Sequence, residues 1–94
     1  MQSESQPTWE ALRNKLEETE NFPLLYMFKF VLPSDNHKVA LLTSQFEEQT
    51  AEITMRTSSS GKHTSITVRL VVLSADEIIN HYKKAVTIEG VIML

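Results

Sequence analysis

Cysteine is absent from the 94 residues of this chain, which excludes disulfides, thiol catalysis and Cys-x-x-Cys metal loops. No run of about 18 apolar residues is present to span a bilayer. The N-terminus also lacks the positive region and apolar run of a signal peptide. Basic residues form no cluster and the net charge is -3, which disfavours nucleic acid and anionic membranes as partners. We therefore expect a cytoplasmic protein that binds neither.

The composition is otherwise ordinary for a folded protein, with 41% hydrophobic and 22% charged residues. A chain of this length buries roughly 60% of its unfolded surface, which is enough for one core between two layers. We expect one compact domain over residues 22–94, preceded by an N-terminal helical extension over residues 1–21.

The extension is predicted to be helical because Trp9, Leu12 and Leu16 recur at helical spacing. Ser5 and Thr8 are both suitable N-cap residues for this helix. The next segment, "FPLLYMFKFVLP", is rich in apolar and aromatic residues and predicts a central strand shielded on both faces. Along this strand Tyr26, Phe28 and Phe30 alternate with Leu25, Met27, Lys29 and Val31.

A second helix is expected from an N-cap at Ser34 to about Gln49, where Asp35 complements the helix dipole. The stretches "EITMRT" and "TSITVRLVV" then alternate as half-buried strands do, joined by "SSSGK". In the second of these, the inward set is expected to be Ile66, Val68, Leu70 and Val72, and the outward set Ser65, Thr67 and Arg69.

The end of the chain predicts a third helix and a short last strand. Ser74 and Glu77 form a capping box, Ile78, Ile79, Tyr82 and Val86 are the apolar positions, and Gly90 ends the segment. "VIML" then closes the sheet. The order strand, helix, strand, strand, helix, strand predicts an α+β, ferredoxin-like βαββαβ two-layer sandwich with an antiparallel sheet in the order 4-1-3-2.

The stretch "SSSGKHTS" raises the question of a phosphate-binding loop. Such a loop needs a first glycine five positions before Gly61, a Ser or Thr after Lys62, and a following helix. His63 follows Lys62 instead, and the next residues have the period of a strand. We therefore expect a hairpin turn in which Gly61 supplies a positive φ.

The sequence resembles the YbeD-like bacterial proteins, the family of domain of unknown function 493. The resemblance covers roughly Asn21 to Leu94, and its most specific part is Ser-x-Gly-Lys-x-x-Ser-[Ile/Val]-Thr, here Ser59 to Thr67. It implies a ferredoxin-like fold similar to the ACT-type regulatory domains, which bind small molecules beside a sheet. It carries over no catalytic residues.

The sequence gives little indication of a catalytic or metal-binding group of side chains, so we expect no enzyme, metal or cofactor. His37, His63 and His81 lack the His-x-x-x-His spacing of a zinc site. The acidic residues at helix starts, such as Asp35 and Asp76, fit helix capping and solvated faces better than acid–base chemistry.

The outward face of the sheet should carry an apolar strip, Leu25, Met27 and Val31, beside polar side chains. It lacks the aromatic residues with which RNA-binding sheets stack on bases. Two hypotheses stay open for the first helix. It folds back over this strip, or it reaches to a partner.

The two sheet edges are expected to differ. Glu52 and Arg56 guard one edge with charge, whereas the apolar "VIML" at the other has no such guard. We expect a homodimer or a protein partner to dock there, and the alternative is that the tail merely packs on the first strand. The predicted interface residues are Val91, Ile92, Met93, Leu94 and Trp9.

The leading interpretation is a non-catalytic regulatory or ligand-sensing domain that resembles ACT-type modules. Its small-molecule ligand is expected around Lys62, His63 and Arg69. The alternative is a protein–protein interaction adaptor that acts through the C-terminal edge strand and the N-terminal helix.

Overall fold

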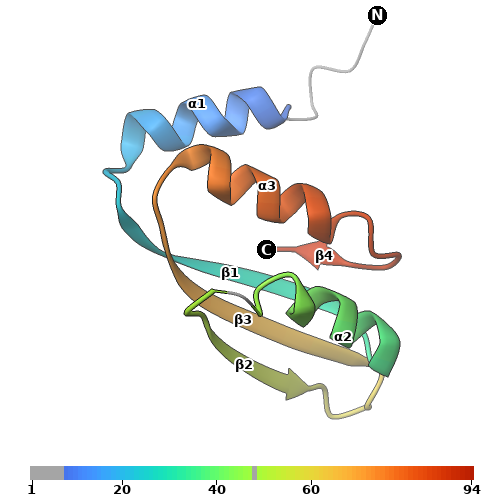
Figure 1. Cartoon of the computed structure of the whole chain (residues 1–94). Coiled ribbons are helices and arrows are strands. Elements are labelled where there is room, and N and C mark those ends of the chain that lie inside the picture. The colour runs from blue at the N-terminus through green and yellow to red at the C-terminus, as the bar shows by residue number, and fades with distance from the viewer. Residues whose placement is uncertain (1–7, 48) are drawn as a thin grey trace, which may run out of the picture.

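A computed structural model describes residues 8–47 and 49–94 of the chain. Helices and strands in this part follow the predicted order, with the first helix preceding the βαββαβ elements (Figure 1). They are α1 (Trp9–Thr19), β1 (Leu24–Pro33), α2 (Asn36–Ser44), β2 (Glu52–Thr57), β3 (His63–Val72), α3 (Ala75–Ala85) and β4 (Ile92–Met93). None of the described helices combines the length and apolar character needed to cross a membrane.

The four strands form one antiparallel sheet in the order β2-β3-β1-β4, which is the predicted order 4-1-3-2 read from the other edge. The central pair, β1 and β3, is in register along its whole length, from Leu24 opposite Val72 to Pro33 opposite His63. The ferredoxin-like βαββαβ sandwich is therefore confirmed.

The core lies between the sheet and the helices, and it contains the even-numbered residues that the alternation predicted. Phe28 and Phe30 of β1 and Val68 of β3 are fully buried. Fully buried Phe46 and Leu42 pack against them from the α2 side, and Ile78 does so from α3. Aromatic contacts connect the layers, since the ring centroids of Phe28 and Tyr82 are 5.4 Å apart.

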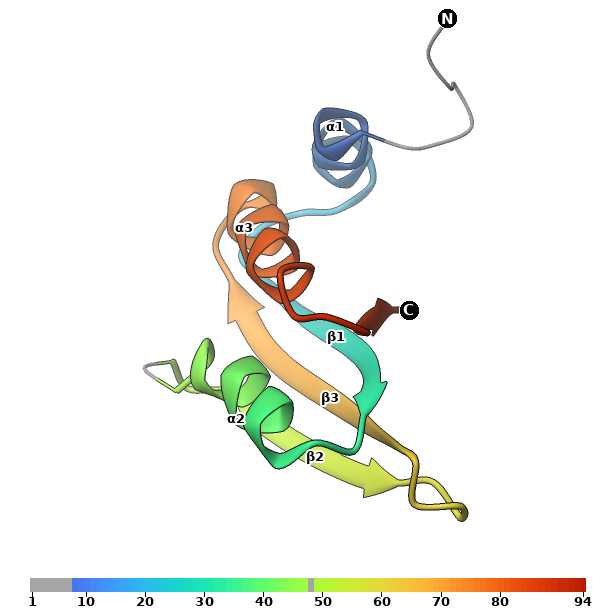
Figure 2. The same ribbon diagram turned by 90° about the vertical axis from the view of Figure 1, so that its right-hand side faces the viewer.

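Helix α1 does not cover the open face of the sheet, so the fold-back hypothesis is wrong. It packs against α3, which lies between α1 and the sheet in both views (Figures 1 and 2). Trp9 stacks on Tyr82 with ring centroids 6.4 Å apart, and Leu16 joins the core. The outward face of β1 consequently stays exposed, at 63% for Leu25 and 44% for Met27, and the prediction of a strand shielded on both faces was also wrong.

The helix ends differ from the predictions in detail. Thr8 caps α1 by accepting a hydrogen bond from the Ala11 N–H, whereas Ser5 lies outside the described residues. Asp35, rather than Ser34, caps α2 by accepting hydrogen bonds from His37 and Lys38, and the bond from the Lys38 N–H is the main cause of its lowered pKa.

Helix α2 ends at Ser44, before the predicted Gln49. The hydroxyls of Thr43 and Ser44 donate to backbone carbonyls three and four residues earlier. Such side-chain bonds compete with the helical pattern and weaken a helix near its end. Residues 45–47 therefore form turns.

The predicted Ser74 cap of α3 is present, but the reciprocal bond of the capping box goes to the residue before the N-cap. Ser74 accepts from the Glu77 N–H at 3.2 Å, and the Glu77 carboxylate in turn accepts from the Leu73 N–H at 2.7 Å. The helix ends at Ala85, so Val86 is an exposed C-cap residue rather than part of the apolar stripe, and Ile88 is buried in the following turn.

Residues 58–62 form the predicted hairpin turn. The Gly61 φ is +79°, and the Ser58 N–H donates to the His63 carbonyl at 2.8 Å to close the hairpin. Because a strand follows the turn, the helix N-terminus that a phosphate-binding loop requires is missing. This stretch is a turn, as expected.

Candidate functional site: the open face of the sheet

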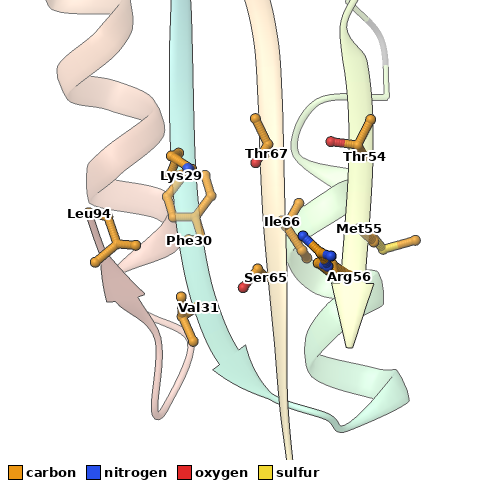
Figure 3. Close-up of a pocket in the computed structure, with 10 residues that line it drawn as sticks. All are labelled: Lys29, Phe30, Val31, Thr54, Met55, Arg56, Ser65, Ile66, Thr67 and Leu94. Atoms are coloured by element: carbon orange, nitrogen blue, oxygen red, sulfur yellow. The ribbon is translucent and has the colours of Figure 1, made fainter. Parts of the chain in front are cut away.

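The face of the sheet opposite the helices carries a shallow hollow of about 510 Å³ that crosses β1, β3 and β2 (Figure 3). Its outward-facing lining is mostly polar and comes from all three strands. These side chains are Lys29, Val31, Thr54, Arg56, Ser65 and Thr67.

The strand register explains how distant residues meet in this hollow. Lys29, Thr67 and Thr54 lie in one row across the sheet, because each is the direct partner of the next. Ser65 and Arg56 lie in the neighbouring row. Two cations on β1 and β2 therefore flank hydroxyl groups that project between them, and Arg56 extends from β2 toward β3 (Figure 3).

The electrostatics of this face are uneven. Within residues 8–47 and 49–94, neither Lys29 nor Arg56 forms an ion pair, whereas Arg69 lies 3.7 Å from the Glu52 carboxylate. A smaller hollow of about 290 Å³ includes that Arg69–Glu52 pair and continues from the first. On this face, the two cations that form no ion pair with the described residues are thus the ones beside the hydroxyls.

The structure separates the predicted ligand residues. Lys62 and His63 are exposed at the hairpin end of β3. Arg69 shares the outward side of β3 with His63 but lies six positions away, about 20 Å along an extended strand. These residues do not form one site, and only Arg69 lies on the open face near the hollows.

Sequence reasoning missed the residues that the sheet does bring together. Lys29 was noticed only as an outward residue, and Arg56 only as a charged guard of the edge. The available signal was the combination of strand order with the period of two, which places Lys29, Arg56, Ser65 and Thr67 on one surface. Ser65 and Thr67 also belong to the Ser59 to Thr67 stretch that is most specific to the family resemblance.

Buried polar groups elsewhere are parts of the core. His81 is stacked on Phe46 with ring centroids 4.5 Å apart, and its backbone carbonyl accepts from the Gln45 amide at 3.0 Å. Burial lowers the pKa of His81, with a smaller contribution from Lys84. In the part of the chain that the structure describes, no three His, Asp or Glu side chains are grouped as metal ligands.

Of the five predicted interface residues, Trp9, Met93 and Leu94 line a second feature, a groove of about 320 Å³ between α1 and the C-terminal edge. Leu94 and Ile92 are the most exposed of them, at 71% and 56%, and Val91 and Met93 are half-buried. Trp9 lines the groove from α1. At its base the hydroxyls of Tyr26 and Tyr82 are 2.9 Å apart, and burial together with this bond raises the pKa of Tyr82.

The chain belongs to the family described as "Protein of unknown function (DUF493)", which matches residues 17–94. The match begins within α1 and includes every strand of the sheet. Neither the curated proteins nor the solved structures contain a match to this chain.

Proposed function

We propose that this member of the DUF493 family is a non-catalytic regulatory or ligand-sensing domain, and that the open face of its sheet binds a small molecule with an anionic group. The observation that carries the proposal is the placement of Lys29 and Arg56 on either side of the Ser65 and Thr67 hydroxyls. The resemblance to ACT-type modules supports it, because those domains bind small molecules beside a similar sheet.

The chemistry of these groups suits a carboxylate or phosphate. A guanidinium donates paired hydrogen bonds to planar anions, an ammonium adds a point charge, and hydroxyls supply further donors. Such charge-assisted bonds are roughly twice as strong as neutral ones. Because the hollow is open to solvent, we expect moderate affinity, as suits a sensor that must release its ligand.

The same surface gives little support for catalysis. A serine or threonine nucleophile needs a base within hydrogen-bonding distance. Within the described residues, none of the hydroxyls in the hollow has such a partner, and the Glu52 carboxylate is paired with Arg69. Binding without turnover is the function that these groups support best.

The test is a thermal-shift screen of the full chain against inorganic phosphate, citrate and common anionic metabolites. A ligand that binds only the folded protein raises its melting temperature, by an amount that grows with the ratio of concentration to Kd. We expect Lys29→Gln and Arg56→Gln each to abolish the shift. Lys62→Gln, which removes a cation at the distant turn, is the matched control and should retain it. No shift with any anion would contradict the proposal, as would loss of the shift in Lys62→Gln alone.

The second candidate is a protein–protein interaction adaptor that acts through the C-terminal edge strand and the N-terminal helix. The exposed apolar side chain of Leu94 beside the Trp9 groove favours it, together with exposed Ile92 on the same edge strand, which pairs with Val31. This candidate includes a homodimer through Val91 to Leu94. Light scattering at high protein concentration tests the homodimer, and a monomeric mass would count against it.

A further inference from the structure

The outer edge of β1 is only partly covered. On its inner side β1 pairs with β3 along all ten residues, but β4 pairs with it only at Phe30 and Val31. One further bond, from the Leu94 N–H to the Lys29 carbonyl, measures 2.9 Å. Within residues 8–47 and 49–94, the segment Leu24–Phe28 has no strand on that side.

The hydrogen bonds fix which backbone groups point to this free edge. The Lys29 carbonyl faces β4, whereas the Ser34 N–H at the end of β1 donates to Lys62 on the β3 side. In an antiparallel strand, successive residues direct their N–H and C=O groups to opposite sides. Leu25 and Met27 therefore each present one N–H and one C=O at the outer edge.

Apolar surface flanks these groups on both sides of the sheet. On the helix side lies the groove of about 320 Å³, lined by Trp9, Leu12, Tyr26 and Tyr82. On the opposite side the Leu25 and Met27 side chains are exposed. A strand added here would direct alternate side chains into the groove and onto this apolar pair.

We propose that the free edge of β1 binds a short extended peptide of a partner protein by strand addition. The residue opposite Tyr26 inserts a large apolar side chain into the groove, and the backbone on either side of it bonds to Leu25 and Met27. Edge pairing supplies affinity and the alternating side-chain pockets supply specificity, as in other strand-addition sites.

The length of the free edge identifies the occupant as a short peptide. It extends for five residues, or about 17 Å, before Leu94 blocks it beside Lys29. Pairing along the whole ten-residue β1 of a second copy would run into this end of the chain. A free peptide segment of about five residues meets no such obstruction.

This inference deepens the adaptor candidate and does not depend on the anion site, whose side chains extend across β1, β3 and β2 on the open face, whereas the peptide bonds to the backbone at the outer edge of β1. Either the anion site or the peptide site can therefore be disproved without affecting the other. Lys29→Gln tests only the anion site. Hydrogen exchange, peptide selection and edge variants test the peptide site.

Hydrogen exchange on the free full chain tests the edge itself. We expect the amides of Leu25 and Met27 to exchange about a hundredfold faster than those of Tyr26 and Phe28, which bond to β3. Equal protection of all four amides would overturn the proposal, since the edge would then already be occupied.

Binding is tested by selecting a phage-displayed random heptapeptide library on the immobilised full chain. We expect enriched sequences with large apolar residues at alternate positions. The Kd of the enriched peptide, made synthetically, is measured from the fluorescence of Trp9, the single tryptophan. Enrichment without this alternation would overturn the proposal.

Matched variants separate backbone pairing from side-chain contact. Met27→Pro removes one outward N–H, and proline is tolerated where the N–H faces away from the sheet. It should weaken peptide binding about tenfold relative to Met27→Ala, which keeps that N–H. If Met27→Pro proves unfolded by circular dichroism, N-methylation of the peptide at alternate residues tests the same bonds. Strand addition would be overturned if Met27→Pro and Met27→Ala bound the peptide equally well. It would also be overturned if peptides N-methylated at odd and at even positions had the same Kd.

Discussion

The two faces of the sheet are built by the same strands but differ in what covers them. Phe28 of β1 is fully buried under the helices, whereas its neighbour Met27 is 44% exposed on the opposite face. On β1 both sets of residues are largely apolar, so this strand alone does not decide which set faces the helices. On β3 the inward set is almost entirely apolar, whereas the outward set is mostly polar and includes Ser65, Thr67 and Arg69.

The comparison shows that β3 orients the whole sheet. Pairing fixes both strands in one register, so the polar set of β3 forces Met27 and Leu25 of β1 onto the open face beside it. The apolar residues left there are then available for contacts other than folding. The face and the edge that the helices leave uncovered are accordingly the surfaces open to a ligand or a partner.

The largest difference between the faces should appear when neighbouring β1 residues are truncated. Phe28→Ala leaves a cavity beneath the helices and should lower the free energy of unfolding by about 3–5 kcal/mol. Met27→Ala on the open face should change it by less than about 1 kcal/mol. Urea denaturation followed by circular dichroism measures both, and similar losses would mean that the assignment of faces is wrong.

A second prediction concerns the helix that was expected on the open face and lies on α3 instead. Leu16→Ala should cost about 2 kcal/mol, at the low end for a buried leucine, because Leu16 keeps 8% of its exposure. The control is Glu17→Ala, which removes only an exposed ion pair with Arg13 and should cost less than about 0.5 kcal/mol. A Leu16→Ala protein as stable as the control would mean that α1 contributes nothing to the fold.

Strand order and the buried set were predictable from sequence because the middle of β3, from Ser65 to Leu70, alternates between polar and apolar residues. The position of α1 was not, since a stripe such as Trp9, Leu12 and Leu16 fits either apolar surface of the domain. Contact with Tyr82 on α3 decided it, and that contact depends on how the helices pack in three dimensions.

The candidate site was harder to predict than the fold. Lys62, His63 and Arg69 are close in the sequence, but an extended strand carries Arg69 far from the turn. Lys29 and Arg56 are distant in the sequence and become neighbours on one face only through the pairing of both strands with β3. The sequence predicted the strand order, but the pairing of individual residues is also needed to show that these two charged side chains share one face.

The third prediction uses the histidines on the two sides of the sheet. The pKa of His81 is lowered by burial in the folded state, so the unfolded chain binds the proton more tightly. The contribution of His81 to the free energy of unfolding should therefore be fully present above about pH 6.5, the ordinary pKa of histidine. It should decrease as the pH falls toward the pKa of His81 in the folded state. Urea midpoints between pH 7.5 and 5 measure this. His81→Gln should flatten the slope, and His63→Gln, which leaves His81 in place, should not. An unchanged slope in His81→Gln would refute this cause.

The smallest effect is expected from the ion pair on the open face. Arg69 and Glu52 are 3.7 Å apart with half or more of each side chain exposed, and such pairs contribute less than about 1 kcal/mol. A double-mutant cycle with Arg69→Ala and Glu52→Ala should give a coupling energy below about 0.5 kcal/mol that decreases further in salt. A coupling above about 1 kcal/mol would show that the open face helps to hold the fold together. With the expected small value, charge changes on this face alter binding without unfolding the protein, which is what the Lys29→Gln and Arg56→Gln tests require.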